Sequence, residues 1–479
     1  MLHSKKRGKK YHFMPDTSAT PLYGSLESDM LLPRDKINKQ AVNPEVAYRM
    51  VADEMLHDGN PRYNLATFVQ TYMEPMARQV MVDTLATNAI DKAEYPQTTE
   101  IEKRCVKIIA DLWNAPKDEQ YMGTSTVGSS EACMLGGMAM KFRWRKQAQA
   151  LGIDVNARKP NLVISSGFQV VWEKFCVYWD IELRELPMTA DCLEMNPDEV
   201  IAACDEYTIG IIPIMGFTYT GGFDDIVAIN NKLNEYNKTA KIPVYMHIDA
   251  ASGGMYLPFV DPKLVWDFRL NNVISISTSG HKFGLVYPGL GWVVWRDKHF
   301  LPEELLFKVA YLGEFEPTFQ INFSRPGSQI WAQYYNFVRW GFEGYKAIHE
   351  KSRDVGIFLA KGLKKMGIFD ILNDGSQIPI ICWALKKNAN KPWDEYDLSD
   401  RLRYYGWQLP AYPMPKNLDD ITIMRAVIRA DQSMEQISLL LNDIEDSISY
   451  LDSHLKTRCA PPTVKESGYT HNESKLKKQ

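Results

Sequence analysis

The sequence predicts an α/β protein whose mostly parallel sheet is covered by helices, followed by a smaller α+β domain near the C-terminus. From Gly123 onward, short apolar strand patterns alternate with helical patterns, which is typical of a parallel sheet with both faces covered. After Pro326 the alternation gives way to a long helical pattern and then to mixed strands and helices. The length of 479 residues also exceeds what one core normally holds, so we expect more than one domain.

Composition is that of an ordinary globular protein, with 45% hydrophobic and 24% charged residues. The net charge of −4 gives no general attraction to nucleic acid. The seven cysteines are scattered and form no C-x-x-C pair, which argues against a disulfide framework or a zinc site and favours a reducing compartment. Because neither a secretory signal nor an apolar run of membrane-spanning length is found, we expect a cytoplasmic protein without a transmembrane segment.

The first hundred or so residues are predicted to be mostly helix and loop. Residues 1–60 are expected to form an N-terminal arm and a helix, because Asn43 and Pro44 are start signals and the apolar face ends before Gly59. The basic run over residues 3–10 is interpreted as a solvated terminus. A second helical segment lies near residues 74–89, and Thr99 with Glu102 is predicted to form a capping box for the next helix.

Residues 61–327 are predicted to form the large domain that contains the sheet. In open sheets of this kind, ligands bind outside the carboxyl ends of the strands. The strand candidates, most of them separated by helix candidates, cover residues 161–165, 181–186, 209–215, 243–248, 273–277 and 291–295.

Residues 328–458 are predicted to form the small domain. It should contain a long helix over 329–366, strands near 378–385 and 421–428, and helices near 398–405 and 434–451. The last segment, 459–479, is polar and begins with prolines, so we expect a flexible tail.

Ser129 and Ser130 follow Gly128 at the predicted start of a helix. Backbone N–H groups, two hydroxyls and the positive end of the helix dipole suit a phosphate group there. Serine is also common as a plain helix cap, so the turn alone does not decide between the two roles. His281 is a candidate donor to the same phosphate, provided that the two segments meet.

Asp249 ends an apolar strand in the segment HIDAASGG, residues 247–254. A buried carboxylate needs a cationic partner, and the protonated pyridine nitrogen of pyridoxal phosphate is such a partner. Aspartates also commonly cap strand ends. The small residues from Ala250 to Gly253, however, leave room for a flat ring.

Lys282 follows a buried strand in ISISTSGHKFG, residues 274–284. A desolvated lysine forms a Schiff base with an aldehyde such as that of pyridoxal phosphate, although a lone lysine after a strand is more often a surface residue. Asp249 and Lys282 are 33 positions apart, from 249 to 282, which allows a connection between adjacent strands. Together the three motifs favour a pyridoxal phosphate site over three unrelated structural roles.

Four segments, HIDAASGG, SISTSGHKFG, GSSEACMLGGMAMKFRWR and IDKAEYPQTTEIE, closely resemble the bacterial pyridoxal-phosphate-dependent glutamate decarboxylases, which are group II amino acid decarboxylases. The resemblance extends from about Pro21 to Leu451. It implies the aspartate-aminotransferase type of fold (fold type I), with active sites at the interface of a homodimer and hexamers in some bacterial members. It also implies decarboxylation of L-glutamate to 4-aminobutanoate and carbon dioxide with pyridoxal 5′-phosphate, and a role in acid resistance.

The resemblance implies cofactor contacts at specific positions of this sequence. Lys282 is similar to the lysine that binds the cofactor aldehyde, and Asp249 to the residue that pairs with the pyridine nitrogen. The other implied contacts are Ala251 and Gln169 on the two faces of the ring, Thr218 near the ring hydroxyl, and Ser129, Ser130, His281 and, from a neighbouring subunit, Ser324 at the phosphate.

The resemblance also implies substrate contacts. Arg425 is similar to the arginine that pairs with the α-carboxylate, and Thr67, Phe68, Asn88 and Asp91 match the residues near the distal carboxylate. Thr67 and Asn88 are neutral donors, whereas Asp91 needs a proton shared with that carboxylate, which favours acid conditions.

His471, in the tail SGYTHNESKLKKQ, is similar to a histidine that closes over the site near neutral pH in bacterial members. The tail here is longer and ends in lysines, so the match is weaker than elsewhere. It contains no tryptophan, so the calmodulin-binding extension of plant members has no counterpart. Two other functions stay open: a decarboxylase of another amino acid, and a non-catalytic protein of the same fold.

Overall fold

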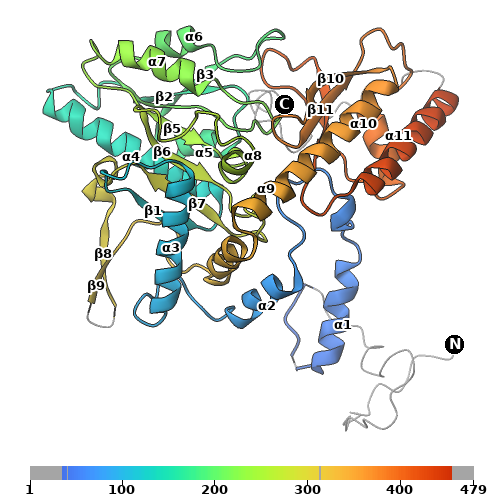
Figure 1. Cartoon of the computed structure of the whole chain (residues 1–479), viewed down its shortest axis with the longest axis horizontal. Helices are drawn as coiled ribbons and strands as arrows, with labels where there is room; N and C mark the ends of the chain where they lie inside the picture. Colours follow the sequence, from blue (N-terminus) through green and yellow to red (C-terminus); the bar gives the residue numbers. More distant parts are fainter. Residues whose placement is uncertain (1–34, 40, 312–313, 456–479) are drawn as a thin grey trace, which may run out of the picture. The chain divides into compact units, whose positions relative to one another are not determined.

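The computed structural model describes residues 35–39, 41–311 and 314–455 (Figure 1). The chain divides after Asn60 into two compact units, residues 1–60 and 61–479. In the first unit, α1 (Pro44–Met55) is capped by Asn43, whose side chain accepts a hydrogen bond from Glu45 N at 2.8 Å. The predicted helix is confirmed, although it ends before Leu56 and does not reach Gly59. The predictions for residues 3–10, for the tail 459–479 and for His471 lie outside the described residues.

The second unit contains a seven-stranded sheet with strand order β1-β7-β6-β5-β4-β2-β3. Strands β3, β2, β4, β5 and β6 pair in parallel, and β7 is antiparallel to both of its neighbours. All six predicted strands are present, whereas β1 was not predicted. The strands are β1 (Met122–Thr126), β2 (Asn161–Ser165), β3 (Glu182–Leu186), β4 (Thr208–Ile212), β5 (Met246–Asp249), β6 (Val273–Thr278) and β7 (Gly291–Trp295).

Helices cover both faces of this sheet, as the alternation of the sequence predicted. Side chains of a strand alternate between its two faces. In β2, accordingly, Val163 joins the core beneath α3 (Pro96–Leu112) and α7 (Ile226–Tyr236), whereas Leu162 and Ile164 join the core beneath α4 (Ser129–Ala150) and α5 (Val171–Tyr178). The remaining helices of this part are η1 (Pro61–Tyr63), α2 (Pro75–Asp83), α6 (Pro197–Ala202), η2 (Gly253–Met255), α8 (Leu257–Val260), η3 (Lys298–Phe300) and η4 (Glu303–Leu305).

The predicted capping box at Thr99 and Glu102 is wrong. Helix α3 begins three residues earlier than Thr99, at Pro96, because proline is well suited to the first helical position. Glu102 therefore lies inside the helix and is buried against β1, where it accepts hydrogen bonds from Ser125 N at 2.8 Å and Thr124 Oγ1 at 3.1 Å. The carboxylate thus ties α3 to the edge strand of the sheet.

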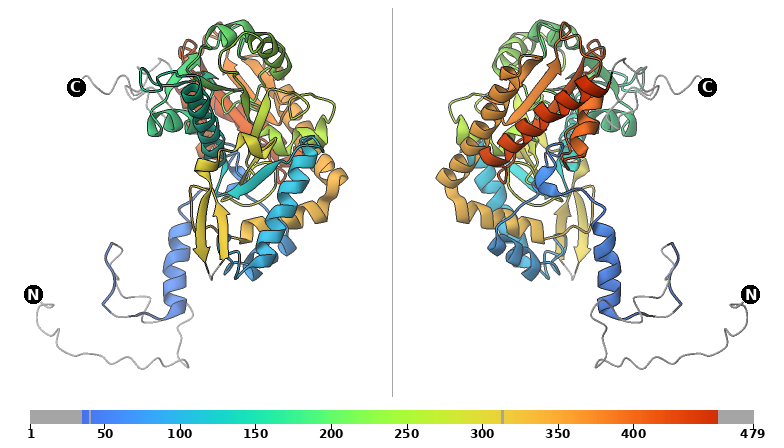
Figure 2. Two further views of the ribbon diagram at one scale, coloured as in Figure 1. Left: turned by 90° about the vertical axis from the view of Figure 1, so that its left-hand side faces the viewer. Right: turned by 90° about the vertical axis from the view of Figure 1, so that its right-hand side faces the viewer.

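A four-stranded antiparallel sheet, with order β10-β11-β13-β12, forms the centre of the C-terminal part. Helix α9 (Ser328–Lys365) runs from the large sheet to this small one (Figure 1), and α11 (Met434–His454) packs across it (Figure 2). Helix α9 begins one residue after position 327, where we predict a domain boundary. The other elements are α10 (Glu395–Arg403), β10 (Phe369–Asp374), β11 (Ile380–Leu385), β12 (Ala411–Pro413) and β13 (Thr422–Val427).

One helix interruption and four strands between residues 307 and 413 were not predicted from the sequence. The long helix is interrupted at Gly341, whose φ of +54° is not helical. Strands β10 and β12 were missed, as was the two-stranded ribbon of β8 (Phe307–Tyr311) and β9 (Glu314–Thr318).

Among the described residues, no helix combines the length and apolarity that crossing a membrane requires.

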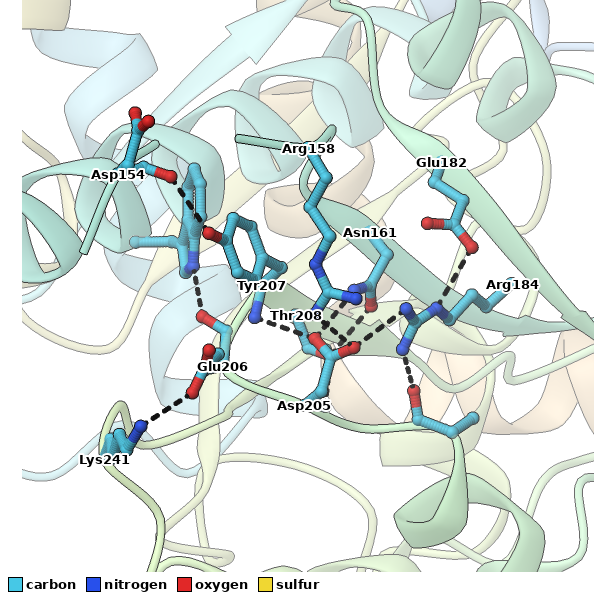
Figure 3. Close-up of polar contacts among 12 residues, drawn as sticks. Asp154, Arg158, Asn161, Glu182, Arg184, Asp205, Glu206, Tyr207, Thr208 and Lys241 are labelled. Atoms are coloured by element: carbon cyan, nitrogen blue, oxygen red, sulfur yellow. Dashed lines mark hydrogen bonds and ion pairs between the residues drawn. The ribbon is translucent and has the colours of Figure 1, made fainter. Parts of the chain in front are cut away.

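Asp205 comes shortly before β4 and contacts Asn161 at the start of β2, so it lies at the amino-terminal edge of the sheet. Figure 3 shows its polar contacts. Its carboxylate accepts hydrogen bonds from Tyr207 N at 2.7 Å and from Asn161 Nδ2, at the start of β2, at 3.0 Å. It also forms ion pairs with Arg158 at 2.7 Å and with Arg184, on β3, at 2.8 Å. One side chain thus connects β2, β3 and the segment that leads into β4.

Candidate active site

A cavity of about 360 Å³ opens at the carboxyl ends of the parallel strands. Such a position follows from the fold, since the loops that leave parallel strands gather at this edge. Eight of the residues singled out from the sequence line the cavity: Ser129, Ser130, Gln169, Thr218, Asp249, Ala251, His281 and Lys282.

Lys282 lies four residues beyond the end of β6, in a turn that includes Gly280 and Gly284. A side chain at Gly280 would place its Cβ 2.7 Å from Gln333 Oε1, so the turn is too tightly packed for one. Burial lowers the pKa of Lys282, an effect opposed by Asp249 and Cys133 and reinforced by Arg425. A lowered pKa increases the share of neutral amine, which is the nucleophilic form.

Asp249 is the last residue of β5 and pairs in register with Ser277 of β6. Its Oδ2 accepts a hydrogen bond from Trp172 Nε1 at 2.8 Å, and its Oδ1 accepts one from Ala251 N at 3.1 Å. The carboxylate is therefore buried, fixed in orientation and exposed on one side to the cavity. A buried carboxylate of this kind suits a protonated ring nitrogen as its partner.

A chain of hydrogen bonds supports this wall of the cavity from behind. Cys133, which lines the cavity, lies 3.3 Å from Ser277 Oγ, and Ser277 Oγ lies 3.0 Å from His247 Nε2. His247 Nδ1 contacts Ser275 Oγ at 2.7 Å, so both ring nitrogens have a hydroxyl partner. Burial lowers the pKa of His247 to about 3, and its ring is therefore neutral near neutral pH.

Ser129 and Ser130 begin α4, as predicted, and their helix points its positive end toward the cavity. His281 lies beside this helix start, since a Cβ at Gly128 would be 3.3 Å from His281 Cε1. His281 Nδ1 accepts a hydrogen bond from Leu290 N at 3.2 Å, which leaves the ring proton on Nε2. Burial, with Lys282 next to it, lowers the pKa of His281 to about 4, so His281 is a neutral donor.

Phe68 and Arg425 lie near Lys282, and Thr67 precedes Phe68 in the chain. The Phe68 ring centroid is 4.9 Å from Lys282 Nζ and 4.5 Å from Arg425 Cζ. Arg425 is 5% exposed and donates from Nη1 to Thr218 O at 2.7 Å. Arg425, Thr67 and Phe68 do not line the cavity themselves, but Thr218 does. A guanidinium is thus held beside the cavity, where it suits a carboxylate.

Asn88, Asp91 and Ser324 are gathered in a second place and do not line the cavity. Asn88 Nδ2 donates to Ser324 Oγ at 3.3 Å, and Arg325 N donates to Asn88 Oδ1 at 3.0 Å. Asp91 N donates to Asn88 O at 3.2 Å. The resemblance implies that Ser324 reaches the site of a neighbouring subunit. Asn88 and Asp91 lie beside Ser324 in this chain.

The site contains three residues that the sequence analysis missed: Cys133, Trp172 and His247. His247 and Cys133 stand inside quoted motifs, but their contacts with Ser277 join segments that are separated in the chain. Trp172 and Asp249 are 77 residues apart. The spacing from His247 to Asp249 was a usable signal, because residues two apart on a strand share a face.

The cavity fits pyridoxal phosphate in its chemistry. A helix start with two serines and a neutral histidine donor suits the phosphate, a buried carboxylate suits the ring nitrogen, and a lysine of lowered pKa suits the aldehyde. Ala251, a small residue in the cavity wall, leaves space for a flat ring.

Comparisons with known proteins agree with this chemistry. Residues 38–386 match the pyridoxal-dependent decarboxylase conserved domain. The glutamate decarboxylase of Lactococcus lactis subsp. lactis (strain IL1403) is 58% identical over 471 residues, which cover 98% of this chain and 100% of that protein. The structure of Lactobacillus brevis CGMCC 1306 glutamate decarboxylase has a TM-score of 0.88 and 56% identity, covering 90% of this chain and 98% of that one.

A more distant structure shares the fold alone. Sphingosine-1-phosphate lyase from Burkholderia pseudomallei K96243 is 18% identical, with a TM-score of 0.72, and covers 88% of this chain and 93% of that one. The predicted fold class, that of pyridoxal phosphate enzymes of fold type I, is therefore confirmed. The chain belongs to the pyridoxal-dependent decarboxylase family, and within it to the bacterial glutamate decarboxylases.

Proposed function

We propose that this protein decarboxylates L-glutamate to 4-aminobutanoate and carbon dioxide with pyridoxal 5′-phosphate. The observation that carries the proposal is that Asp249, at the end of β5, and Lys282, beyond the end of adjacent β6, line one cavity with the start of α4. Relatives that are more than half identical over almost the whole chain have the name glutamate decarboxylase.

The residues that would hold the cofactor follow from the chemistry of the cavity. We assign Lys282 to the aldehyde, Asp249 to the pyridine nitrogen, and Ala251 and Gln169 to the two ring faces. The phosphate is assigned to Ser129, Ser130 and His281, with Ser324 from a neighbouring subunit. When bound, the cofactor supplies an electron sink for the charge that develops at the substrate Cα.

The protein's own contribution is orientation and proton control. Trp172 fixes the carboxyl group of Asp249 in the orientation that faces the ring nitrogen. Arg425 is assigned to the α-carboxylate, and its contacts with Phe68 and Thr218 O fix the orientation of the guanidinium. Lys282 or its immediate surroundings returns a proton to Cα.

The distal carboxylate is assigned to Thr67, Phe68, Asn88 and Asp91. Because Asp91 and the distal carboxylate repel each other unless they share a proton, we propose that activity is favoured in acid. His471 is proposed to gate the site with pH, so that truncation before Ser467 extends activity toward neutral pH.

The minimum unit is proposed to be a homodimer, with hexamers as a larger form. The support is that Asn88, Asp91 and Ser324 lie together outside their own chain's cavity, where a second copy can receive them. A cytoplasmic location is also proposed, supported by six free cysteines among the described residues.

The test is carbon dioxide release from L-glutamate as a function of pH, with tyrosine and aspartate as alternative substrates. We expect release from glutamate alone, and Lys282→Ala should abolish it because the amine that binds the aldehyde is lost. Native activity in Lys282→Ala, or turnover of tyrosine or aspartate in place of glutamate, contradicts the proposal.

A further inference from the structure

Residues 61–71 form a loop that carries Thr67 and Phe68, two of the residues assigned to the substrate. Apart from the turn η1, its regular backbone pairing is a single bridge between Asn64 and Gln408. Such a loop has carbonyl groups that no helix or strand satisfies, and buried carbonyls require other donors. Those donors determine the shape of the loop.

Arg429, two residues after β13 ends, provides donors to three of these carbonyls from one side chain. It is 2% exposed. Its Nη1 donates to Asn64 O at 2.7 Å and to Thr67 O at 3.0 Å, and its Nη2 donates to Pro61 O and to Thr71 Oγ1, both at 3.1 Å. All four acceptors belong to the loop, and they lie on both sides of Phe68.

The contact requires the flat, forked shape of a guanidinium. An ammonium group offers three donors from one nitrogen and cannot reach acceptors spread over ten residues. Thr71 completes the arrangement, because its hydroxyl also donates to Asp431 Oδ2 at 3.3 Å. Asp431 lies 3.8 Å from Arg429 Nε and balances the buried charge.

The loop transmits this shape to the reacting centre. Phe68 is the residue whose ring contacts both Lys282 and Arg425. Gln70 N donates to His281 O at 2.8 Å, and Arg425 Nη2 donates to Ala66 O. A shift of the loop would therefore move the Phe68 ring relative to Lys282 and Arg425.

We propose that Arg429 is a positioning residue that sets substrate affinity by fixing the Thr67–Phe68 segment. This inference rests on the proposed function, because it assigns that segment to the amino acid substrate. Arg429 does not line the cavity, and its hydrogen bonds go to Gln432 and to the loop of residues 61–71. None of these partners is assigned to the cofactor. Its loss should weaken substrate binding and leave cofactor binding unchanged.

The test compares Arg429→Lys with a matched control, Arg296→Lys. Arg296 is also largely buried and holds a loop by its carbonyls, donating from Nη1 to Phe268 O at 2.8 Å and to Leu270 O at 3.0 Å, but it lies at the opposite edge of the sheet. We expect Arg429→Lys to raise KM for L-glutamate roughly tenfold, the effect of one lost charge-assisted hydrogen bond, with kcat and the cofactor absorbance little changed. The control should keep a native KM.

A second measurement does not depend on activity. Hydrogen exchange of the peptide that covers residues 61–71 should be faster in Arg429→Lys than in the wild type or in Arg296→Lys. Should Arg429→Lys fail to fold, Thr71→Val removes one acceptor at nearly constant shape, and it should change KM and exchange in the same direction by a smaller factor.

The outcomes separate this inference from the proposed function. Wild-type protein that releases no carbon dioxide from glutamate overturns the function. The role of Arg429 is overturned if the wild type is active and Arg429→Lys keeps the native KM and the native exchange rate. Where Arg429→Lys does not fold, the same result in Thr71→Val overturns it.

Discussion

Replacing Asp205 by asparagine should destabilise the fold at the edge of the sheet away from the cavity. An amide retains one acceptor oxygen, which can keep the hydrogen bonds from Tyr207 N and Asn161 Nδ2. Its NH₂ group then faces the guanidinium groups of Arg158 and Arg184, which lie 2.7 and 2.8 Å from Asp205 Oδ2 in the wild type. Two charge-assisted hydrogen bonds are lost, and donors face donors.

The exposure of these groups sets the size of the effect. The side chain of Asp205 is 29% exposed, and those of Arg158 and Arg184 are 45% and 21% exposed. Exposed ion pairs contribute about 0.2–1 kcal/mol each, and hydrogen bonds to charged groups about 1.5–3 kcal/mol. Since solvent screens the Arg158 pair in part, we expect the free energy of unfolding to fall by about 1–3 kcal/mol at neutral pH.

The loss should depend on pH in a defined direction. Burial acts to raise the pKa of Asp205, but hydrogen bonds from Tyr207 N, Asn161 and Arg184 outweigh it and hold the pKa below its usual range. As pH falls, the unfolded state therefore takes up the proton first, near the ordinary value of about 3.9. The stabilisation is complete above that pH and disappears as pH falls through the lower folded value.

The assay is urea unfolding followed by tryptophan fluorescence, from pH 7 down to about pH 3, at constant cofactor saturation. Glu235→Gln is the control, because its ion pair with Lys238 is 2.7 Å long but 72% and 65% exposed, so a change within about 0.5 kcal/mol is expected. The reasoning is refuted if Asp205→Asn changes stability no more than the control does, or if its deficit persists unchanged in acid.

Two further predictions concern the cavity wall. Trp172→Phe removes the 2.8 Å hydrogen bond to buried Asp249 and should weaken cofactor retention about 10- to 100-fold. The control, Trp144→Phe, loses a 2.9 Å hydrogen bond to a backbone carbonyl away from the cavity and should leave retention unchanged. Retention is measured by absorbance after dialysis, and equal retention in the two variants contradicts the role of Trp172. Gly136→Ala should lower the free energy of unfolding by about 1–3 kcal/mol, because the added Cβ would lie 2.3 Å from the His247 ring. This clash should outweigh the higher helix propensity of alanine. An unchanged or higher urea midpoint contradicts the close packing of Gly136 against His247.

The sequence was informative where local pattern and chemistry coincide. The strand ends at Asp249 and Thr278, the helix start at Ser129 and the cavity that they share were predictable, because apolar runs, small residues and ionisable side chains follow one another directly. Strand β12 has three residues and ends in proline, so it has too little periodicity to be predicted.

Contacts between distant segments were not predictable from pattern. Glu102 was assigned to its own helix, yet its partners are in β1, and Arg429 reaches a loop more than 350 positions away. Neither periodicity nor capping signals carry information about which segments meet in space. The group of Asn88 and Ser324 is a further case, since its side chains were matched to a motif and lie outside the cavity of their own chain.

The in-register pairing of Asp249 with Ser277 has a consequence for how this site tolerates change. The ladder of backbone hydrogen bonds between β5 and β6 sets where both strands end, independently of the 23 residues from 250 to 272 that connect them. Lengthening or replacing the surface part of that connection should therefore leave Asp249 and Lys282 at the same separation. A one-residue slip of the ladder would instead turn the side chains of β6 to the opposite face and displace the turn that carries Lys282 relative to Asp249.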